Sequence, residues 1–353
     1  MQVLSGKLFP FQRAIVSRLN RASRELLLPD GGRVIDFSRP AGEAALGAPA
    51  SVSWRIFKNP ITTYIGGVTA VILELAEPRV RTGVWEHSGF RKDPLRRLRR
   101  TGLAAMVTVY GARSAAEAMI AGVRRMHDRV RGETPQGEAY SANDPELLNW
   151  VQATAAFGFL QAYHVYAAPL SLAERDRYYR DGEIAARLYG ATEPPRSEAE
   201  LEALFLAMRP RLEASPIVFE FLHIMRTARI LPPLLKPVQP LLVRAAVSLT
   251  PPWVRNCLAI GEDLGLRTWE GVLVRRSCAF AESIMLESSP AVQACIRLGL
   301  PANYLYKRRN KAEGQDQTLC SPPEEAGGPS HGKLLSRVAP DRPAPSLKHG
   351  GWA

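Results

Sequence analysis

Hydrophobic positions recur with a helical period through the middle of the chain. One aliphatic run follows Gly66-Gly67 and stops at Pro78, with its members three or four residues apart: Val68, Val71, Ile72 and Leu75. Asp93-Pro94 and Asp144-Pro145 each join an N-cap residue to a proline at the first helical position, so both pairs predict helix starts. The other expected helices span about residues 115–131, closed by Gly132, then 145–166, 171–190, 197–212, 215–228 and parts of 230–300.

The pattern contains no convincing alternating strand and no repeat of 20 to 50 residues. We therefore expect an all-α fold, with a single multi-helix domain over residues 51–300. Residues 1–50 are expected to form an N-terminal amphipathic, basic segment and a connector. The amphipathic segment either packs as a surface helix or makes reversible contact with an anionic membrane. Residues 301–353 contain 7 Pro and 6 Gly, a composition typical of a disordered tail.

Composition narrows the class of protein. The chain has 353 residues, 46% of them hydrophobic, so a sizeable core is expected. No apolar run is long enough to span a membrane and no secretory signal is visible, so we expect a cytoplasmic protein. The four cysteines lie 17 to 25 residues apart without a CxxC pair, which excludes zinc ribbons and disulfide scaffolds.

The formal net charge of +12 is concentrated in one stretch. Residues 77–132 contain 13 Lys and Arg against 5 Asp and Glu, which accounts for two-thirds of the excess. This stretch lacks interleaved stacking aromatics, and its arginines recur within apolar helical patterns. We therefore expect no nucleic-acid partner, and a small buried anion becomes a plausible ligand.

His127 is the first candidate for chemistry, because it is in register with the apolar positions Ile120, Val123 and Val130. A lone histidine on an apolar face is usually a structural core residue. Arg124 and Arg131, at i−3 and i+4, fall on the same predicted helix face. Two guanidiniums that flank a core-facing imidazole would be costly unless an anion met them.

The preceding helix presents a similar face. Arg97, Arg100 and Thr101 stand at i, i+3 and i+4, and the alternative interpretation is a solvated basic ridge. Taken together, the two helices suit a ligand that needs one axial nitrogen and carries two carboxylates. Haem b meets that description, since imidazole binds its iron and arginines pair with its propionates.

Several motifs in order resemble the oxygenase family that includes the latex clearing proteins (rubber oxygenases) and the MpaB proteins. The motifs are Gly66-Gly67, Glu86-His87-Ser88-Gly89-Phe90, Asp93-Pro94, Arg97-Leu98-Arg99-Arg100-Thr101, Met126-His127-Asp128-Arg129-Val130-Arg131-Gly132, Tyr140-Ser141-Ala142-Asn143-Asp144-Pro145 and Asn149-Trp150-Val151-Gln152-Ala153. The resemblance covers about residues 50–300. It implies a globin-like helical domain that binds haem b and an oxygenase activity, which in rubber oxygenases cleaves double bonds with dioxygen.

Position by position, the resemblance implies that His127 is the proximal iron ligand. It places Arg124 and Arg131 near the haem, together with Arg97 and Thr101 of the preceding helix. We expect Thr101 to take part in catalysis by donating a hydrogen bond at the haem edge or the distal face. The chain departs from the family pattern at two positions. Arg100 stands where rubber-cleaving members have a lysine that can cap the iron, and Gln152 stands where the Trp-Val-x-Ala motif usually carries histidine. Arginine stays protonated and is a poor iron ligand, so a capped iron is not expected.

Glu86 and His87 are the candidates for a distal acid-base group, since latex clearing proteins use a glutamate near the haem. Both residues could equally be a polar pair at a helix end. Glu220 and His223 have the i, i+3 spacing of di-iron bundles, but no second copy of that motif occurs.

We therefore predict a haem-dependent oxygenase or related oxidoreductase that uses dioxygen or peroxide. Its predicted substrate is a hydrophobic, unsaturated small molecule such as a lipid or terpenoid. The alternative is a non-catalytic helical protein that binds lipid or an anionic partner through its basic face.

Overall fold

The computed structural model describes residues 35–228 and 233–307 of the chain. This part contains thirteen α-helices, which confirms the predicted all-α fold class. The helices are α2 (Val52–Phe57), α3 (Pro60–Glu74), α4 (Pro78–His87), α5 (Pro94–Tyr110), α6 (Arg113–His127), α7 (Pro145–Tyr166), α8 (Leu172–Tyr189), α9 (Glu198–Met208), α10 (Pro216–Thr227), α11 (Gln239–Leu249), α12 (Pro252–Cys257), α13 (Thr268–Ser283) and α14 (Pro290–Arg297). No helix among the described residues is long and apolar enough to cross a membrane.

Short elements join these helices. They are the strands β1 (Arg131–Glu133) and β2 (Ala139–Ser141) and the 3-10 turns η1 (Arg209–Arg211), η2 (Pro233–Val238), η3 (Glu262–Leu264) and η4 (Tyr304–Tyr306). The predicted N-terminal amphipathic segment and most of the predicted tail fall on residues 1–34 and 308–353, outside the described residues.

Side-chain caps fix the starts of the helices that surround the candidate site. The Asp93 carboxylate accepts a hydrogen bond from the Arg96 N–H at 3.0 Å, and the Asp144 carboxylate accepts one from the Glu146 N–H at 2.9 Å. These bonds satisfy N–H groups that the first turn of a helix leaves free. Both predicted Asp-Pro starts are therefore confirmed, as α5 and α7.

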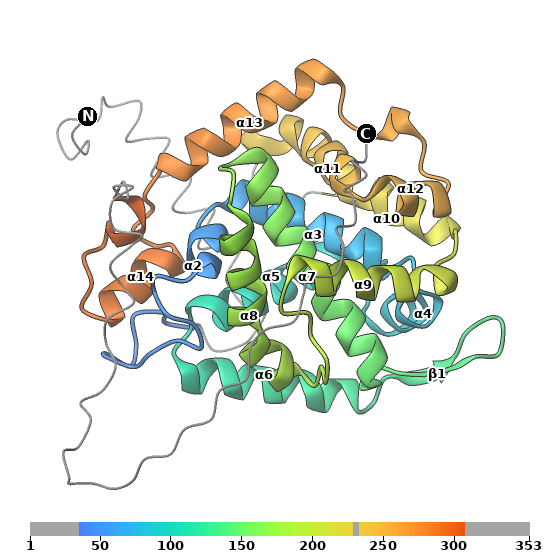
Figure 1. Cartoon of the computed structure of the whole chain (residues 1–353), viewed down its shortest axis with the longest axis horizontal. Coiled ribbons are helices and arrows are strands. Elements are labelled where there is room, and N and C mark those ends of the chain that lie inside the picture. Colours follow the sequence, from blue (N-terminus) through green and yellow to red (C-terminus); the bar gives the residue numbers. More distant parts are fainter. Residues whose placement is uncertain (1–34, 229–232, 308–353) are drawn as a thin grey trace, which may run out of the picture. The chain divides into compact units, whose positions relative to one another are not determined.

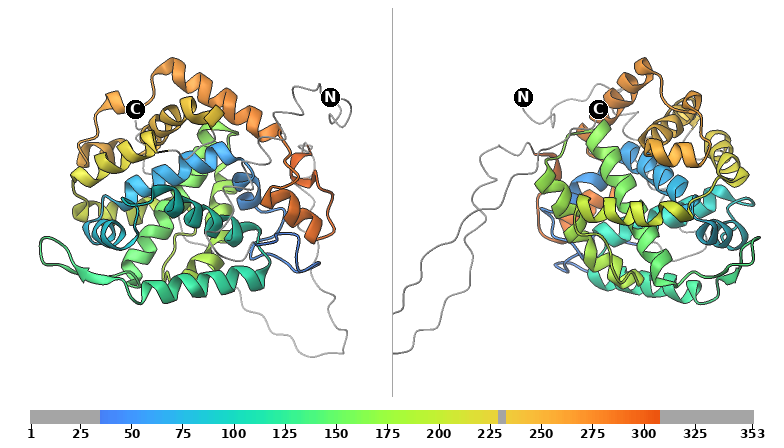
Figure 2. Two further views of the ribbon diagram at one scale, coloured as in Figure 1. Left: turned by 180° about the vertical axis from the view of Figure 1, so that it is seen from behind. Right: turned by 45° about the vertical axis from the view of Figure 1, so that its right-hand side comes forward.

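The core is built around the contact between α3 and α7, which lie between α13 on one border and α6 on the other (Figures 1 and 2). Gly66 and Gly158 meet at this contact. A Cβ atom on Gly66 would lie 2.7 Å from the Gly158 carbonyl oxygen, so only glycine permits this separation. Our sequence prediction started the helix after Gly67 and was wrong, because Asn59 caps α3 seven residues before Gly66 and both glycines are inside the helix.

The helix expected over residues 115–131 ends at His127. The chain then turns into an antiparallel hairpin in which Arg131 pairs with Ser141 and Gly132 with Tyr140. Backbone pairing with a segment ten residues away replaces the helical hydrogen bonds that Arg131 would have made. The expectation of no strand was therefore wrong for this hairpin, although it contributes only six residues.

One buried arginine joins the first described residues to the end of the bundle. Arg297, at the end of α14, is 2% exposed, and its guanidinium donates hydrogen bonds to four backbone carbonyls. The acceptors are Phe37, Glu43 and Tyr110 at 2.8 Å and Gly111 at 3.2 Å. Because carbonyls rather than a carboxylate satisfy this charge, Arg297 ties the segment around residues 37–43 to α5 and α14.

Candidate functional site

His127 is the last residue of α6, and its side chain is half-buried. The same helix turns Ala116 and Ile120 into the core, so the imidazole follows the inward stripe that the sequence pattern predicts. Its Nδ1 atom is buried and has no hydrogen-bond partner in the described part of the chain. Eight other buried side-chain nitrogen or oxygen atoms of the described residues share this state, and His127 is the one histidine among them.

Arg97 of α5 acts electrostatically on this imidazole. Burial lowers the pKa of His127 below its ordinary value, and the positive charge of Arg97 lowers that pKa further. The neighbouring Asp128 opposes both effects, but only in part. The imidazole is therefore neutral at neutral pH, which is the form that binds metals.

Glu74, the last residue of α3, is a third member of this group. Burial raises the pKa of Glu74 from 4.5 to about 7, although the attraction of Arg97 partly offsets the rise. Burial also lowers the pKa of Arg97, while Glu74 opposes that shift. We call Glu74, Arg97 and His127 the charged cluster. Glu74 is not among the residues predicted from the sequence, where its only signal is that it is the one carboxylate within the apolar run of α3.

Two further predicted residues of α5 lie beside the charged cluster and are exposed. The Arg100 guanidinium donates a hydrogen bond to Sδ of Met126 at 3.2 Å, which joins α5 to the residue next to His127. The Thr101 hydroxyl donates to the Arg97 carbonyl at 3.0 Å, within its own helix. The alternative of a solvated basic ridge therefore holds for Arg100, which is exposed, but not for Arg97, which is half-buried.

Arg124 lies three residues before His127 within α6, as the sequence predicts, but Arg131 does not share that helix face. Arg131 is the first residue of β1, so its spacing of four residues from His127 does not place it on a shared helix face. Its guanidinium donates a hydrogen bond to the Asp128 carbonyl at 3.4 Å. Arg124 is within α6, and its side chain lies close to Gly190. A Cβ atom on that glycine would be 3.8 Å from Nε of Arg124. Both arginines are exposed, so neither carries the cost of burial that the sequence argument assumed.

Glu86 and His87 lie at the end of α4, and both interact with Tyr140 of β2. The Tyr140 hydroxyl donates to Oε2 of Glu86 at 3.3 Å and lies 3.1 Å from Nε2 of His87. Burial and the charge of Glu86 raise the pKa of Tyr140. Within the described residues, no hydrogen bond or ion pair joins Glu86 or His87 to His127.

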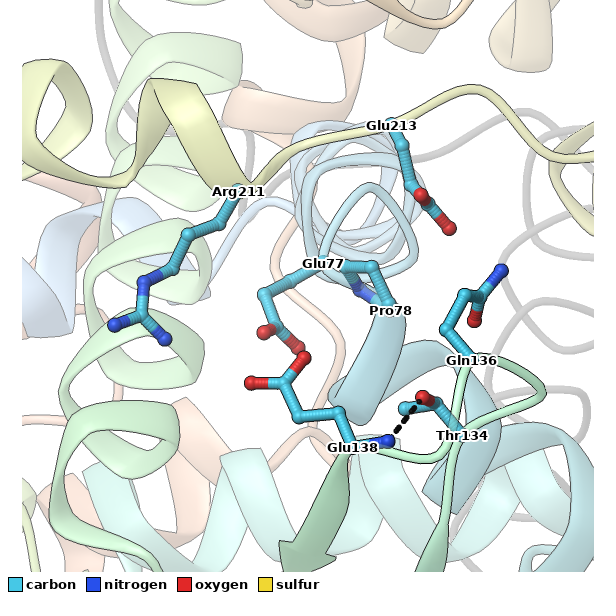
Figure 3. Close-up of a pocket in the computed structure, with 7 residues that line it drawn as sticks. All are labelled: Glu77, Pro78, Thr134, Gln136, Glu138, Arg211 and Glu213. Carbon is cyan, nitrogen blue, oxygen red and sulfur yellow. Dashed lines mark hydrogen bonds between the residues drawn. The ribbon is translucent and has the colours of Figure 1, made fainter.

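A hollow of about 180 Å³ lies near the start of α4 and is lined by three carboxylates (Figure 3). Its lining residues are Glu77, Pro78, Thr134, Gln136, Glu138, Arg211 and Glu213. The buried Glu77 carboxylate accepts from Nε of Arg79 at 2.6 Å and from the Val80 N–H at 2.7 Å. These bonds satisfy the carboxylate, so we interpret this network as part of the fold. It contains none of the predicted site residues.

Metal ligation by several side chains is not supported. Among residues 35–228 and 233–307, no group of three or more His, Cys, Asp or Glu could hold an ion. His223 is exposed, and Glu220 pairs with Nε of Arg91 at 2.8 Å on the surface. An iron already held by a porphyrin needs only one protein nitrogen, so this result does not bear on His127.

The charged cluster meets the electrostatic demands of haem b. The neutral His127 imidazole has an unpaired buried nitrogen, and the half-buried Arg97 is a cation for which the described residues supply only the partly protonated Glu74. An imidazole nitrogen for the iron and a cation near a propionate are two of the contacts by which proteins hold haem b. His127 and Arg97 fit these two contacts of a haem site.

One comparison with known proteins identifies a family for this chain. The family model described as "ER-bound oxygenase mpaB/B'/Rubber oxygenase, catalytic domain" matches residues 54–282, which include α3 to α12, all but the last residue of α13, and the whole charged cluster. No curated protein and no solved structure matches the chain. Since the matched region is more than half of the chain, the protein belongs to the mpaB/rubber oxygenase catalytic-domain family.

Proposed function

We propose that this chain is a haem b-dependent oxygenase that acts on a hydrophobic, unsaturated small molecule such as a lipid or terpenoid. Its family supports an oxygenase role in general. The observation that carries the haem proposal is the state of His127, a half-buried, neutral imidazole whose Nδ1 atom has no partner among the described residues.

In this proposal His127 binds the iron, and Arg97 pairs with a propionate. Arg124 and Arg131 are exposed, so they would assist at the solvent edge, while Arg100 and Thr101 lie on the α5 side. When bound, haem b supplies the redox chemistry toward dioxygen or peroxide. Arg97 has a second effect, because its charge disfavours protonation of His127 and keeps the imidazole available as a ligand.

Three residues are the candidates for holding a proton in this proposal: Glu74, Glu86 and His87. Glu74 has a pKa of about 7, so its carboxyl oxygens exchange a proton near neutral pH. Glu86 and His87 remain candidates for a distal acid-base group, and both would act through the Tyr140 hydroxyl that they share. Arg97 interacts electrostatically with both Glu74 and His127, and it therefore couples these two residues. No such interaction couples Glu86 or His87 to His127 within the described residues.

The decisive experiment is the visible absorption spectrum of the purified, haem-reconstituted protein, first oxidised, then reduced, then exposed to carbon monoxide. We expect a Soret band that shifts with each treatment and is lost in His127→Ala. His223→Ala is the matched control, because it removes an exposed imidazole from α10 and should leave the band unchanged. Retention of haem by His127→Ala would refute the assignment.

The arginines should differ in their effect on haem affinity. Arg131 is exposed, and an exposed ion pair contributes at most about 1 kcal/mol, so Arg131→Ala should weaken haem binding by no more than about fivefold. Arg97 is half-buried, and its loss should cost more because solvent screens it less. Haem titration of Arg97→Ala and Arg131→Ala measures both losses of haem affinity. A larger loss of affinity for Arg131→Ala would contradict the proposed role of Arg97.

The second candidate is a non-catalytic protein that binds lipid or an anionic partner through its basic face. The exposed guanidiniums of Arg100, Arg124 and Arg131 favour it, as do the departures at Arg100 and Gln152. A protein that stays colourless after haem reconstitution would support this candidate.

A further inference from the structure

The outward face of α13 is apolar although it covers nothing in the described structure. Four of the twelve large hydrophobic residues that are exposed in the described residues lie on this single helix: Trp269 at 59%, Val272 at 44%, Leu273 at 44% and Phe280 at 63%. Their spacing of three, one and seven residues places them on one side of an α-helix. We call these four residues the α13 outer face.

The opposite side of α13 already supplies the contacts that hold it to the protein. Val274, Cys278 and Ala281 are buried there, and the helix packs on α3, α7 and α11. Figures 1 and 2 show α13 along a border of the bundle. A helix that is apolar on both sides is normally enclosed, whereas a border helix needs only one apolar stripe. The α13 outer face is therefore more apolar than its place in the fold requires.

The charges of α13 are sorted between its two sides. Glu270 pairs with Nε of Arg244 at 3.0 Å, and Glu282 pairs with Nζ of Lys58 at 2.8 Å, so both carboxylates of the helix are engaged by the protein. Arg275 and Arg276 are exposed, and Arg276 falls between the apolar side chains of the outer face. The outward side of the helix thus combines apolar residues with positive charge and no exposed carboxylate.

We propose that the α13 outer face docks on the surface of a bilayer that contains anionic phospholipid. Trp269 and Phe280 would enter the boundary between headgroups and acyl chains, with the helix in the membrane plane. Arg275 and Arg276 would extend along their aliphatic stems toward lipid phosphates. This inference does not depend on haem, so it stands or falls separately from the proposed oxygenase function.

Charge distinguishes this occupant from two others. A second copy that docked face to face would place Arg276 opposite its own equivalent, and like charges across an interface are unfavourable. The basic N-terminal stretch of the chain carries Lys7, Arg13 and Arg18 and would meet the same repulsion. An anionic lipid surface is complementary to both the apolar and the charged residues of the α13 outer face.

The test is co-sedimentation of the full chain with vesicles of phosphatidylcholine alone or with 30% phosphatidylserine, compared among matched variants. Trp269→Ser/Phe280→Ser removes apolar area and should lower the partition coefficient by about tenfold or more. Arg275→Gln/Arg276→Gln should lower it by about fivefold per arginine, and only on phosphatidylserine vesicles. The controls are Leu172→Ser/Leu206→Ser, which replaces two exposed residues of α8 and α9, and Arg177→Gln/Arg180→Gln, which removes the same charge from α8.

We expect both control proteins to bind vesicles like the unmodified chain. Equal loss in α13 and control variants would overturn the proposal, because it would indicate a general effect of hydrophobicity or net charge. Unchanged binding of the α13 variants would overturn it as well. Light scattering of the same proteins provides the third outcome: a dimer that dissociates in Trp269→Ser/Phe280→Ser would assign the α13 outer face to self-association instead.

Discussion

The substitution Glu74→Gln should change how the stability of the protein depends on pH. Glu74 ends α3, where burial favours the protonated carboxyl and raises its pKa from 4.5 to about 7. Glutamine resembles the protonated form in shape and hydrogen bonding, but it cannot ionise. The comparison therefore isolates the free energy of ionising this carboxyl inside the fold.

The magnitude follows from the difference in pKa between the folded and unfolded states. Since the folded pKa is the higher one, the folded state binds the proton more tightly, and the normal protein loses stability as the pH rises from about 4.5 to about 7. Each pKa unit corresponds to about 1.4 kcal/mol, so the loss above pH 7 reaches up to about 3 kcal/mol. Glu74→Gln should avoid this loss, because it has no charge to bury.

The assay is urea denaturation of the full chain without added haem, at pH 5 and pH 8, for both proteins. The free energy of unfolding of Glu74→Gln minus that of the normal protein should rise by about 2 to 3 kcal/mol between the two pH values. Glu202→Gln, on the exposed side of α9, controls for the loss of one carboxylate. A difference that stays constant or falls with pH would refute the reasoning, since it would mean that the electrostatic attraction of Arg97 outweighs burial.

Two predictions concern packing and hydrogen bonding away from the site, and thermal or urea denaturation can check both. Gly66→Ala should cost about 2 to 3 kcal/mol, because its Cβ would overlap the Gly158 carbonyl oxygen. Gly67→Ala, whose Cβ would lie 3.8 Å from the Phe159 ring, should be neutral or stabilise the protein by up to about 1 kcal/mol. Equal losses of stability in the two variants would contradict the close contact of α3 and α7 at Gly66. Arg297→Met should cost about 3 to 5 kcal/mol, because four carbonyls lose their donor; a loss below about 1 kcal/mol would mean that water replaces the guanidinium.

Local signals explain what the sequence predicted correctly. The Asp-Pro pairs at Asp93 and Asp144 specify helix starts through hydrogen bonds within four residues, so no distant part of the chain is needed. The helical period of the apolar residues gave the all-α class for the same reason. In both cases the interaction that decides the structure is contained in the window that shows the pattern.

Nonlocal contacts explain the errors. We placed Gly66 and Gly67 before the helix because the aliphatic run follows them, but the contact with α7 requires Gly66 inside the helix. The helix after Ala115 was extended to Arg131, although pairing with residues 139–141 draws the backbone into a hairpin. In each case the deciding partner lies on a segment that the local pattern does not reveal.

The candidate site was predictable only in part for the same physical reason. His127 was found because its own helix carries the apolar register, and Arg97 because it is near Arg100 and Thr101 in sequence. Glu74 was missed, since its electrostatic interaction with Arg97 joins α3 to α5 and depends on burial. The burial assumed for Arg131 was wrong because the helix that would have imposed it ends at His127.

The positions of the charged cluster along its helices provide an independent reason to assign function to it. Glu74 is the last residue of α3 and Arg97 is in the first turn of α5. Helix dipoles disfavour an anion at a C-terminus and a cation at an N-terminus, so both residues occupy the end that opposes their charge. Burial disfavours both charges further. The stability of the fold does not explain these two residues, and the role proposed for them beside His127 is the explanation that we offer.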